Sequence, residues 1–174
     1  AIGSLAALHH IAPSARTAAT IRRCGERLLA GAKPMPVGTG WPLQDTAALL
    51  GFSHGVAGIA WALFEAASLT GAPRFRTVAL DGLAYERSHF APEHGNWPDL
   101  RASDVPTAPP SFMHAWCHGA PGIGLGRLRL LRHLDDPAIR LEIEAAIQST
   151  LATGFGANHS VCHGDLGNLD LVLE

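Results

Sequence analysis

The chain has 174 residues, of which 47% are hydrophobic and 16% are charged, and its formal net charge is -2 with the histidines neutral. These values predict one folded domain that is large enough to bury a hydrophobic core, and they exclude a disordered chain. The weak charge excludes a broad basic surface for nucleic acid, and the apolar runs are broken by Gly, Arg and His, so no membrane span is predicted.

Apolar residues at helical spacing predict an all-α chain, and no alternating strand pattern of useful length is present. The clearest helix is at residues 136–152, because Asp136 can cap it and Pro137 suits its first turn. Two stretches dense in Pro, Gly and polar residues, 33–42 and 91–111, are expected to be loops. Helices are expected at residues 14–30, 55–70, 74–88, 122–133 and 136–152.

A motif of the form X-His-Gly-x-x-Gly occurs three times, each time at the start of an apolar helical pattern. The copies are SHGVAGI at 53–59, CHGAPGI at 117–123 and CHGDLGN at 162–168, and IGSLAAL at 2–8 resembles the tail of a further such helix. An amphipathic helix follows each of the first two copies, so the repeating unit is a pair of helices. Such pairs stack, because one unit cannot bury its own apolar face, and they form a superhelix or close into an α/α toroid.

Close packing at a helix start explains the second glycine of each motif, since a glycine has no Cβ to obstruct a neighbour. These glycines are Gly58, Gly122 and Gly167. Packing does not explain why a histidine precedes the first glycine in all three copies. The motifs therefore predict chemistry as well as structure.

Cys117, Cys162 and His163 offer two sulfurs and one nitrogen, which are zinc donors. Three protein ligands leave one tetrahedral position open, as in a catalytic zinc site, and a helix N-terminus favours the thiolate. The spacing alone also fits two buried thiols and a histidine that caps a helix. Cys24 lies on the apolar stripe of its own helix and is interpreted as a core residue.

His54 and His118 occupy the same motif position as His163. Ser53 replaces cysteine before His54, so His54 is a candidate general acid or base rather than a ligand, because imidazole titrates near neutral pH. A histidine that only hydrogen bonds within the helix bundle is the structural alternative. His118 is a candidate fourth ligand, a residue that supports the ligands, or a wall residue.

Three segments in this order, GFSHGVAGIAWAL (51–63), AWCHGAPGIGLGRL (115–128) and NHSVCHGDLGNLDLV (158–172), strongly resemble the lanthionine synthetase C-like family. The sequences of these segments are most similar to the cyclase domain of class II, two-domain lanthipeptide synthetases, and the resemblance covers nearly all of the chain. It implies an α/α toroid of inner and outer helices, with the inner helices started by the HGxxG motifs and zinc at one end.

By match to the family's motifs, the resemblance implies that Cys117, Cys162 and His163 bind zinc and that His54 is the active-site histidine. The implied reaction adds a zinc-bound cysteine thiolate of a precursor peptide to a dehydroalanine or dehydrobutyrine, which closes a lanthionine or methyllanthionine ring. The implied partners are a dehydrated ribosomal precursor peptide and the rest of a synthetase with an N-terminal dehydratase domain. The implied location is the bacterial cytoplasm, and the three cysteines without short spacings fit a reducing compartment.

The chain departs from the family's pattern in two places. The family's catalytic aspartate is expected before residue 1, because Asp45 is too close to His54 in the sequence. Met113 and His114 stand where some members carry an arginine, so that role is not carried over. His118 stands where some members have tyrosine, which suggests a substrate-contacting or supporting role.

The resemblance predicts that residues 1–174 are a single partial cyclase domain, truncated at both ends, with roughly half of the helix pairs of a toroid. We expect this chain alone to be an incompetent cyclase, and robust thioether formation by it would overturn that expectation. Two other functions remain open from the residues: a zinc hydrolase that uses metal-bound water, and a non-catalytic helical repeat that binds peptide.

Overall fold

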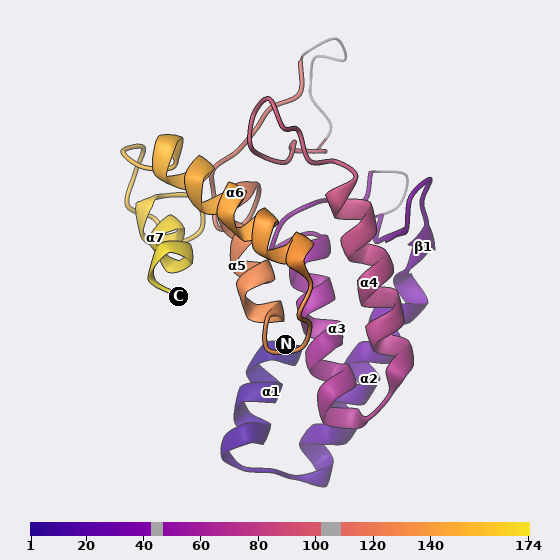
Figure 1. Cartoon of the computed structure of the whole chain (residues 1–174). Coiled ribbons are helices and arrows are strands. Elements are labelled where there is room, and N and C mark those ends of the chain that lie inside the picture. The colour runs from indigo at the N-terminus through magenta and orange to yellow at the C-terminus, as the bar shows by residue number, and fades with distance from the viewer. Residues whose placement is uncertain (43–46, 102–108) are drawn as a thin grey trace.

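A computed structural model describes residues 1–42, 47–101 and 109–174; Asp45 lies outside these residues. The described residues form seven helices and one two-stranded antiparallel sheet (Figure 1). The strands are β1 Lys33–Pro34 and β2 Thr39–Gly40. The helices are α1 Ile2–Ile11, α2 Ala15–Gly31, α3 Val56–Thr70, α4 Pro73–Arg87, α5 Ala120–Leu130, α6 Pro137–Thr153 and α7 Asp165–Leu173.

The helix boundaries follow from local chemistry, and most lie close to the predicted ones. Ser14 Oγ accepts a hydrogen bond of 3.1 Å from the Thr17 N–H at the start of α2, and Asp136 caps α6 as expected. α3 ends at Gly71, which has the left-handed φ of 66° that glycine adopts most easily. α5 ends at Leu130, earlier than the predicted helix at 122–133.

The segment 33–42 is more ordered than the loop predicted for it. β1 and β2 pair there as a short hairpin, with Lys33 opposite Gly40, and β2 packs on α4. A two-residue strand cannot show the alternation of apolar and polar residues by which strands are detected in a sequence. The hairpin therefore escaped the sequence analysis.

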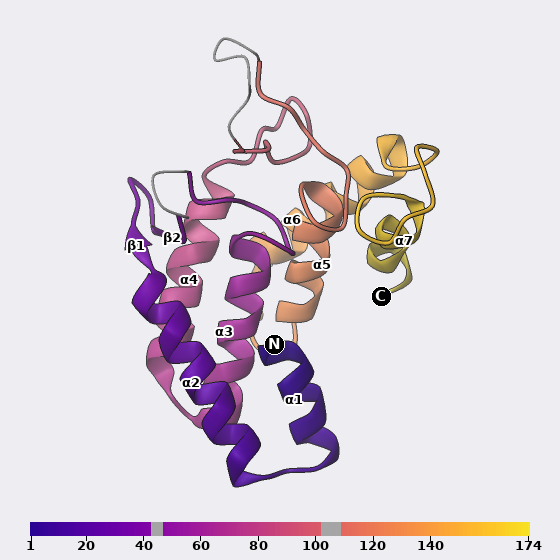
Figure 2. The ribbon, with the colours of Figure 1, turned by 180° about the vertical axis from the view of Figure 1, so that it is seen from behind.

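Consecutive helices form stacked pairs. α1, α3, α5 and α7 contact one another in that order, and α2, α4 and α6 pack around them. α6 lies in front of α5 in Figure 1, and α2 lies in front in the view from behind (Figure 2). α3, α5 and α7 each begin directly after the first glycine of an HGxxG motif. The prediction of an all-α partial toroid with motif-started inner helices is confirmed.

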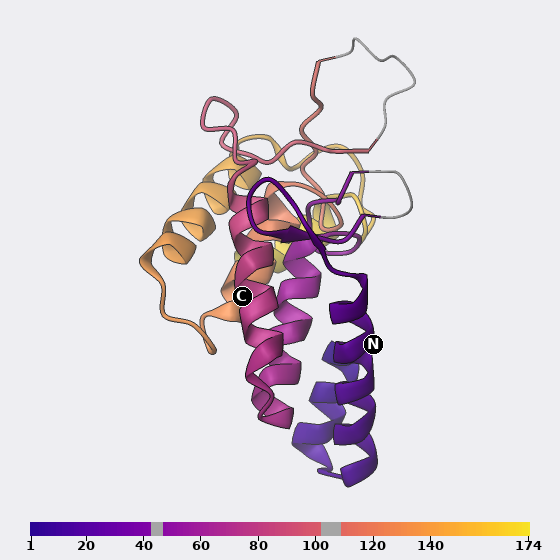
Figure 3. The ribbon, with the colours of Figure 1, turned by 90° about the vertical axis from the view of Figure 1, so that its right-hand side faces the viewer.

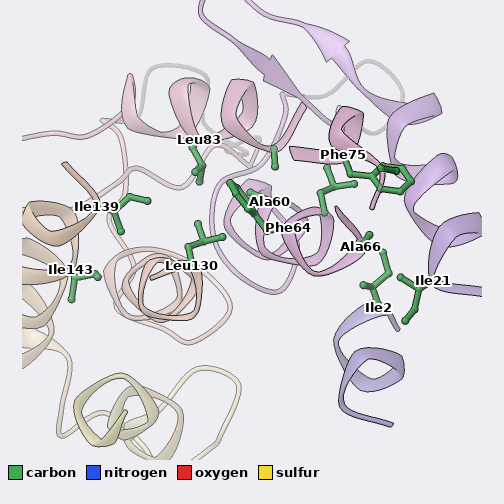
Figure 4. Packing of buried hydrophobic residues seen from close by; sticks show 13 residues of the cluster. Ile2, Ile21, Ala60, Phe64, Ala66, Phe75, Leu83, Leu130, Ile139 and Ile143 are labelled. Carbon is green, nitrogen blue, oxygen red and sulfur yellow. The ribbon is translucent and has the colours of Figure 1, made fainter. Parts of the chain in front are cut away.

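The main core runs between the two layers of helices. It joins Ile2 of α1, Phe64 of α3, Phe75 of α4 and Ile139 of α6 in one cluster (Figure 4). Phe64 and Phe75 are at most 1% exposed. Cys24 is half-buried and packs against this cluster, which confirms its interpretation as a core residue. Burial of these side chains fixes the spacing of the inner helices and therefore of the loops at their ends.

The motif loops and the described residues between α4 and α5, 88–101 and 109–119, lie at the same end of the helix stack, as a side view shows (Figure 3). None of the helices in the described residues is long and apolar enough to cross a membrane. Several large apolar side chains of α7, including Leu169 and Leu173, are exposed.

Candidate metal centre

Each motif loop curls back onto the first turn of its own helix. The backbone at the second glycine touches the carbonyl oxygen of the residue six positions earlier, so closely that a Cβ would collide with it. The distance from such a Cβ to that oxygen is 1.9 Å for Gly58 and Phe52, 2.2 Å for Gly122 and Trp116, and 1.8 Å for Gly167 and Val161. The packing interpretation of these glycines is confirmed, and the geometry is the same in all three copies.

Backbone hydrogen bonds join the three loops at equivalent positions. The Ser53 N–H donates to the Cys117 carbonyl oxygen at 3.4 Å, and the Cys117 N–H donates to the Cys162 carbonyl oxygen at 3.2 Å. The residue before the histidine in each copy is thus bonded to its counterpart in the next copy. Residues far apart in the sequence are thereby brought to one place at the end of the helix stack.

The Cys117 thiol lies close enough to the Cys162 thiol to be influenced by it, and both cysteines are free. Cys117 is buried and Cys162 is exposed. Burial, together with the neighbouring Cys162 thiol, raises the pKa of Cys117 to about 11. Thiolates are ligands of thiophilic metals, and a bound cation favours the thiolate form, so the two cysteines fit a metal such as zinc.

His163 follows Cys162 directly, but its side chain is exposed and no packing fixes its orientation. Its backbone N–H bonds to Ser160 Oγ at 3.3 Å. In the part of the chain that the structure describes, no three His, Cys, Asp or Glu side chains are gathered closely enough to hold a metal ion as they stand. The donor set of two sulfurs and one imidazole fits zinc chemically, and the assignment of His163 as the third ligand stays a prediction.

His54 and His118 form a second pair beside the cysteines. Their rings stack with centroids 5.4 Å apart and an angle of 24° between the planes. His54 is exposed, whereas His118 is only 4% exposed. Burial lowers the pKa of His118, and the nearby charge of Arg101 adds to that effect. A neutral His118 ring can therefore lie against His54 without charge repulsion.

Two charged residues near this pair escaped the sequence analysis. Arg101 bonds to Asp99 through Nε at 2.9–3.0 Å and through its Nη2, and Arg101 Nη2 also contacts Met113 Sδ at 2.9 Å. Burial alone would raise the pKa of Asp99, but the hydrogen bonds and charge of Arg101 outweigh it and hold that pKa below its usual value. The Arg101 guanidinium thus lies beside Met113, which is one of the two positions where some family members carry an arginine and this chain does not. Only the fold reveals this, because nothing in the local sequence links residue 101 to the second motif.

Asn96 holds the loop of the second motif in place. Its side chain is fully buried; Oδ1 accepts from the Ala120 N–H at 2.7 Å, and Nδ2 donates to the Met113 carbonyl oxygen at 3.0 Å. The Ala120 N–H is one of the first of α5 and has no partner within the helix. Asn96 therefore serves as a cap for α5 from a distant part of the chain.

We expect Asn96→Ala to lower the free energy of unfolding by about 2 kcal/mol, because it leaves a buried N–H and a buried carbonyl without partners. Urea denaturation measures this loss. Gln148→Ala, which removes an exposed amide bonded at 3.3 Å to Glu144, is the control and should change stability by less than about 0.5 kcal/mol. Equal effects of the two substitutions would contradict the capping role.

The stacked helix pairs, with three equivalent loops bonded together at one end around two cysteines, define a helical-repeat domain of the α/α toroid class. The family model described as "Lanthionine synthetase C-like protein" matches residues 5–174, and the chain belongs to this family. A search of curated proteins finds no match.

Six chains of solved structures match the chain. One of them is described as "Nisin cyclase"; it is 25% identical, has a TM-score of 0.58, and the match covers 72% of this chain and 33% of that one. The chain thus spans about a third of the length of this relative.

Proposed function

We propose that this chain is part of a zinc-dependent lanthipeptide cyclase, which adds a peptide cysteine thiol to a dehydroalanine or dehydrobutyrine of the same precursor peptide. The observation that carries the proposal is the backbone hydrogen bond that joins Cys117 to Cys162, from successive repeats, beside the stacked His54 and His118. The match to a structure described as nisin cyclase supports the reaction class. The sequences of the three motifs support a class II synthetase, in which a dehydratase domain would precede the cyclase domain.

In this proposal Cys117 and Cys162 hold zinc, and His163 completes the protein ligands. When bound, zinc lowers the pKa of the substrate thiol. The substrate thiol loses its proton to a base, its sulfur forms a bond to the β-carbon of the dehydro residue, and the electrons of the carbon–carbon double bond move toward the carbonyl oxygen. A proton must reach the α-carbon to complete the addition.

His54 is the candidate proton donor, because its exposed ring stands on the first motif loop, next to the loop that carries Cys117. Arg101, held by Asp99, offers a positive charge to the oxygen on which negative charge develops. Neither residue needs to form a covalent bond to the peptide. The loops bring a nucleophile site and an acid together, which is the main requirement of an intramolecular addition.

The test is an assay of ring formation on a dehydrated, cysteine-containing precursor peptide. Addition leaves the peptide mass unchanged and removes the free thiol, so a thiol-alkylating reagent no longer reacts with the product. A hydrolase would instead split the peptide into fragments whose summed mass exceeds that of the peptide by one water. A peptide-binding repeat would bind without either change, and either of these two outcomes in a polypeptide that carries this chain within a complete ring of helix pairs would overturn the proposal. The assay compares this chain with a polypeptide that carries it within a complete ring of helix pairs.

We expect His54→Gln to lower kcat for ring formation by about 10²-fold, the usual contribution of a general acid, without changing the metal content. The amide cannot deliver a proton to carbon, while its size is similar. The control is His10→Gln, since His10 is exposed at the end of α1, away from the motif loops. An unchanged kcat in His54→Gln would remove His54 from the mechanism.

A further inference from the structure

A single buried carboxylate clamps both ends of the loop that carries His54. Glu86, in the last turn of α4, is fully buried. Its Oε1 accepts hydrogen bonds from the Gly51 N–H at 2.9 Å and from the Ala57 N–H at 3.2 Å. These two N–H groups lie before and after His54 in the sequence. Movement of the loop at either end would therefore break a buried, charge-assisted hydrogen bond.

The clamp replaces a missing helix cap. The N-cap of α3 is Gly55, which has no side chain to accept a hydrogen bond, and the Ala57 N–H is among the first N–H groups of the helix, which have no intrahelical partner. A negative charge at a helix N-terminus is also favoured by the helix dipole. Glu86, on α4, thus accepts the hydrogen bond of the Ala57 N–H, for which the first motif itself provides no acceptor.

The other oxygen of Glu86 links the clamp to the second motif. Arg127 of α5 is fully buried, with its Nη1 2.9 Å from Glu86 Oε2 and its Nε 2.6 Å from Glu142 Oε2. α5 begins at the second motif, so the ion pair joins the His54 loop to the helix that carries the loop of Cys117 and His118. A buried ion pair is often no more stabilising than apolar residues of the same size, but it fixes relative position.

We propose that Glu86 is a positioning residue, which holds His54 in register with His118 and Cys117 by tying the first motif loop to Arg127. The inference rests on the proposed function only in giving His54 a chemical role. The second motif loop is held differently, by the neutral Asn96. The first loop is tied by charge to the helix of its neighbour, and this makes the spacing between the two loops depend on Glu86.

The variant that tests this is Glu86→Gln. An amide has one acceptor oxygen, so if that oxygen faces Gly51 and Ala57, its NH₂ group faces the Arg127 guanidinium. The opposite orientation points the NH₂ group at the two backbone N–H groups. One of the two attachments is lost in either case. The matched control is Glu65→Gln, because Glu65 is also buried and ion-paired, to Arg132, but lies in the half of α3 away from the motif loop.

The readouts are amide hydrogen exchange at Gly51 and Ala57 and the NMR contact between the His54 and His118 rings. In Glu86→Gln we expect the ring contact to disappear in either orientation, and exchange at these two amides to be at least about 10-fold faster, relative to the core amide of Leu63, when the NH₂ group faces them. In Glu65→Gln both readouts should remain as in the unchanged chain. Retained protection and a retained ring contact in Glu86→Gln would overturn the proposal.

The unchanged chain provides a test that does not depend on the folding of a variant. The Gly51 N–H, although it lies in a loop, should exchange within about 10-fold of the Leu63 amide, and exchange at the rate of an open loop would overturn the proposal. These readouts need no substrate. If ring formation fails while Gly51 and Ala57 respond as expected, the proposed function is wrong and the positioning role of Glu86 stands.

Discussion

Replacement of either Cys117 or Cys162 by alanine is expected to abolish zinc binding. The unchanged chain, purified under reducing conditions and freed of excess metal, should retain about one zinc ion, and each variant less than about a tenth of that. The reason is that the site draws one thiol from each of two successive repeats, so neither cysteine can replace the other. Elemental analysis measures the metal content. Competition with a chromophoric chelator measures the affinity, which should fall by at least about 10⁴-fold.

Cys24→Ala is the matched control, because Cys24 is the third cysteine of the chain and packs against the core. Its zinc content should equal that of the unchanged chain. Full zinc content in Cys117→Ala or Cys162→Ala would refute the assigned site. A fall in Cys24→Ala as large as in the other two would show that the assay reports folding rather than ligation.

His163→Ala tests whether His163 is the third zinc ligand. The ring of His163 is exposed and is not gathered with the cysteines, so its recruitment depends on the attraction of a metal. If His163 is the third ligand, its loss weakens zinc binding but leaves the backbone hydrogen bond between Cys117 and Cys162 intact. The metal affinity therefore separates its role from that of Cys117.

The sequence predicts the helical part of this fold well, because the helix starts carry strong local signals. Asp136 and Pro137 mark the start of α6, and the motif glycines mark the starts of the inner helices. The convergence of the motifs could also be predicted, since equivalent helix starts in stacked repeats lie at the same end. The bonds from Ser53 to Cys117 and from Cys117 to Cys162 agree with this prediction.

The residues that hold the site together could not be predicted from the sequence. Glu86 contacts Gly51 and Asn96 contacts Ala120 across 35 and 24 positions of the chain, and no local pattern encodes such pairs. Arg127 lies within an apolar helix, where a charged side chain would ordinarily be expected at the surface. Its burial becomes intelligible only when two carboxylates from other helices are seen around it.

Gly122→Ala is expected to lower the free energy of unfolding by about 4 kcal/mol, a large effect for the addition of one methyl group. The new Cβ would lie 2.2 Å from the Trp116 carbonyl oxygen and 3.0 Å from Phe52 Cβ. The first of these atoms belongs to the backbone, so the clash cannot be relieved by a rotamer change and the loop itself must move. Urea denaturation of the variant and of the unchanged chain measures the difference.

Gly31→Ala is the control for the intrinsic effect of the substitution. Gly31 is the last residue of α2, and a Cβ there would meet only Trp41 Cδ1 at 3.5 Å, an ordinary contact. Because alanine favours the helix, this variant should be as stable as the unchanged chain or slightly more stable. If Gly122→Ala lowers the free energy of unfolding by less than about 1 kcal/mol, the loop does not approach its helix as closely as described.

The same substitution connects stability with chemistry. The Trp116 carbonyl belongs to the residue directly before Cys117, so a loop pushed away from α5 carries the Cys117 thiol away from Cys162. Gly122→Ala should therefore lose zinc affinity together with stability, whereas Asn96→Ala, which leaves this close approach in place, should lose stability with a smaller effect on zinc. If Gly122→Ala is destabilised by about 4 kcal/mol yet binds zinc as tightly as the unchanged chain, the close approach at Gly122 does not determine the position of Cys117.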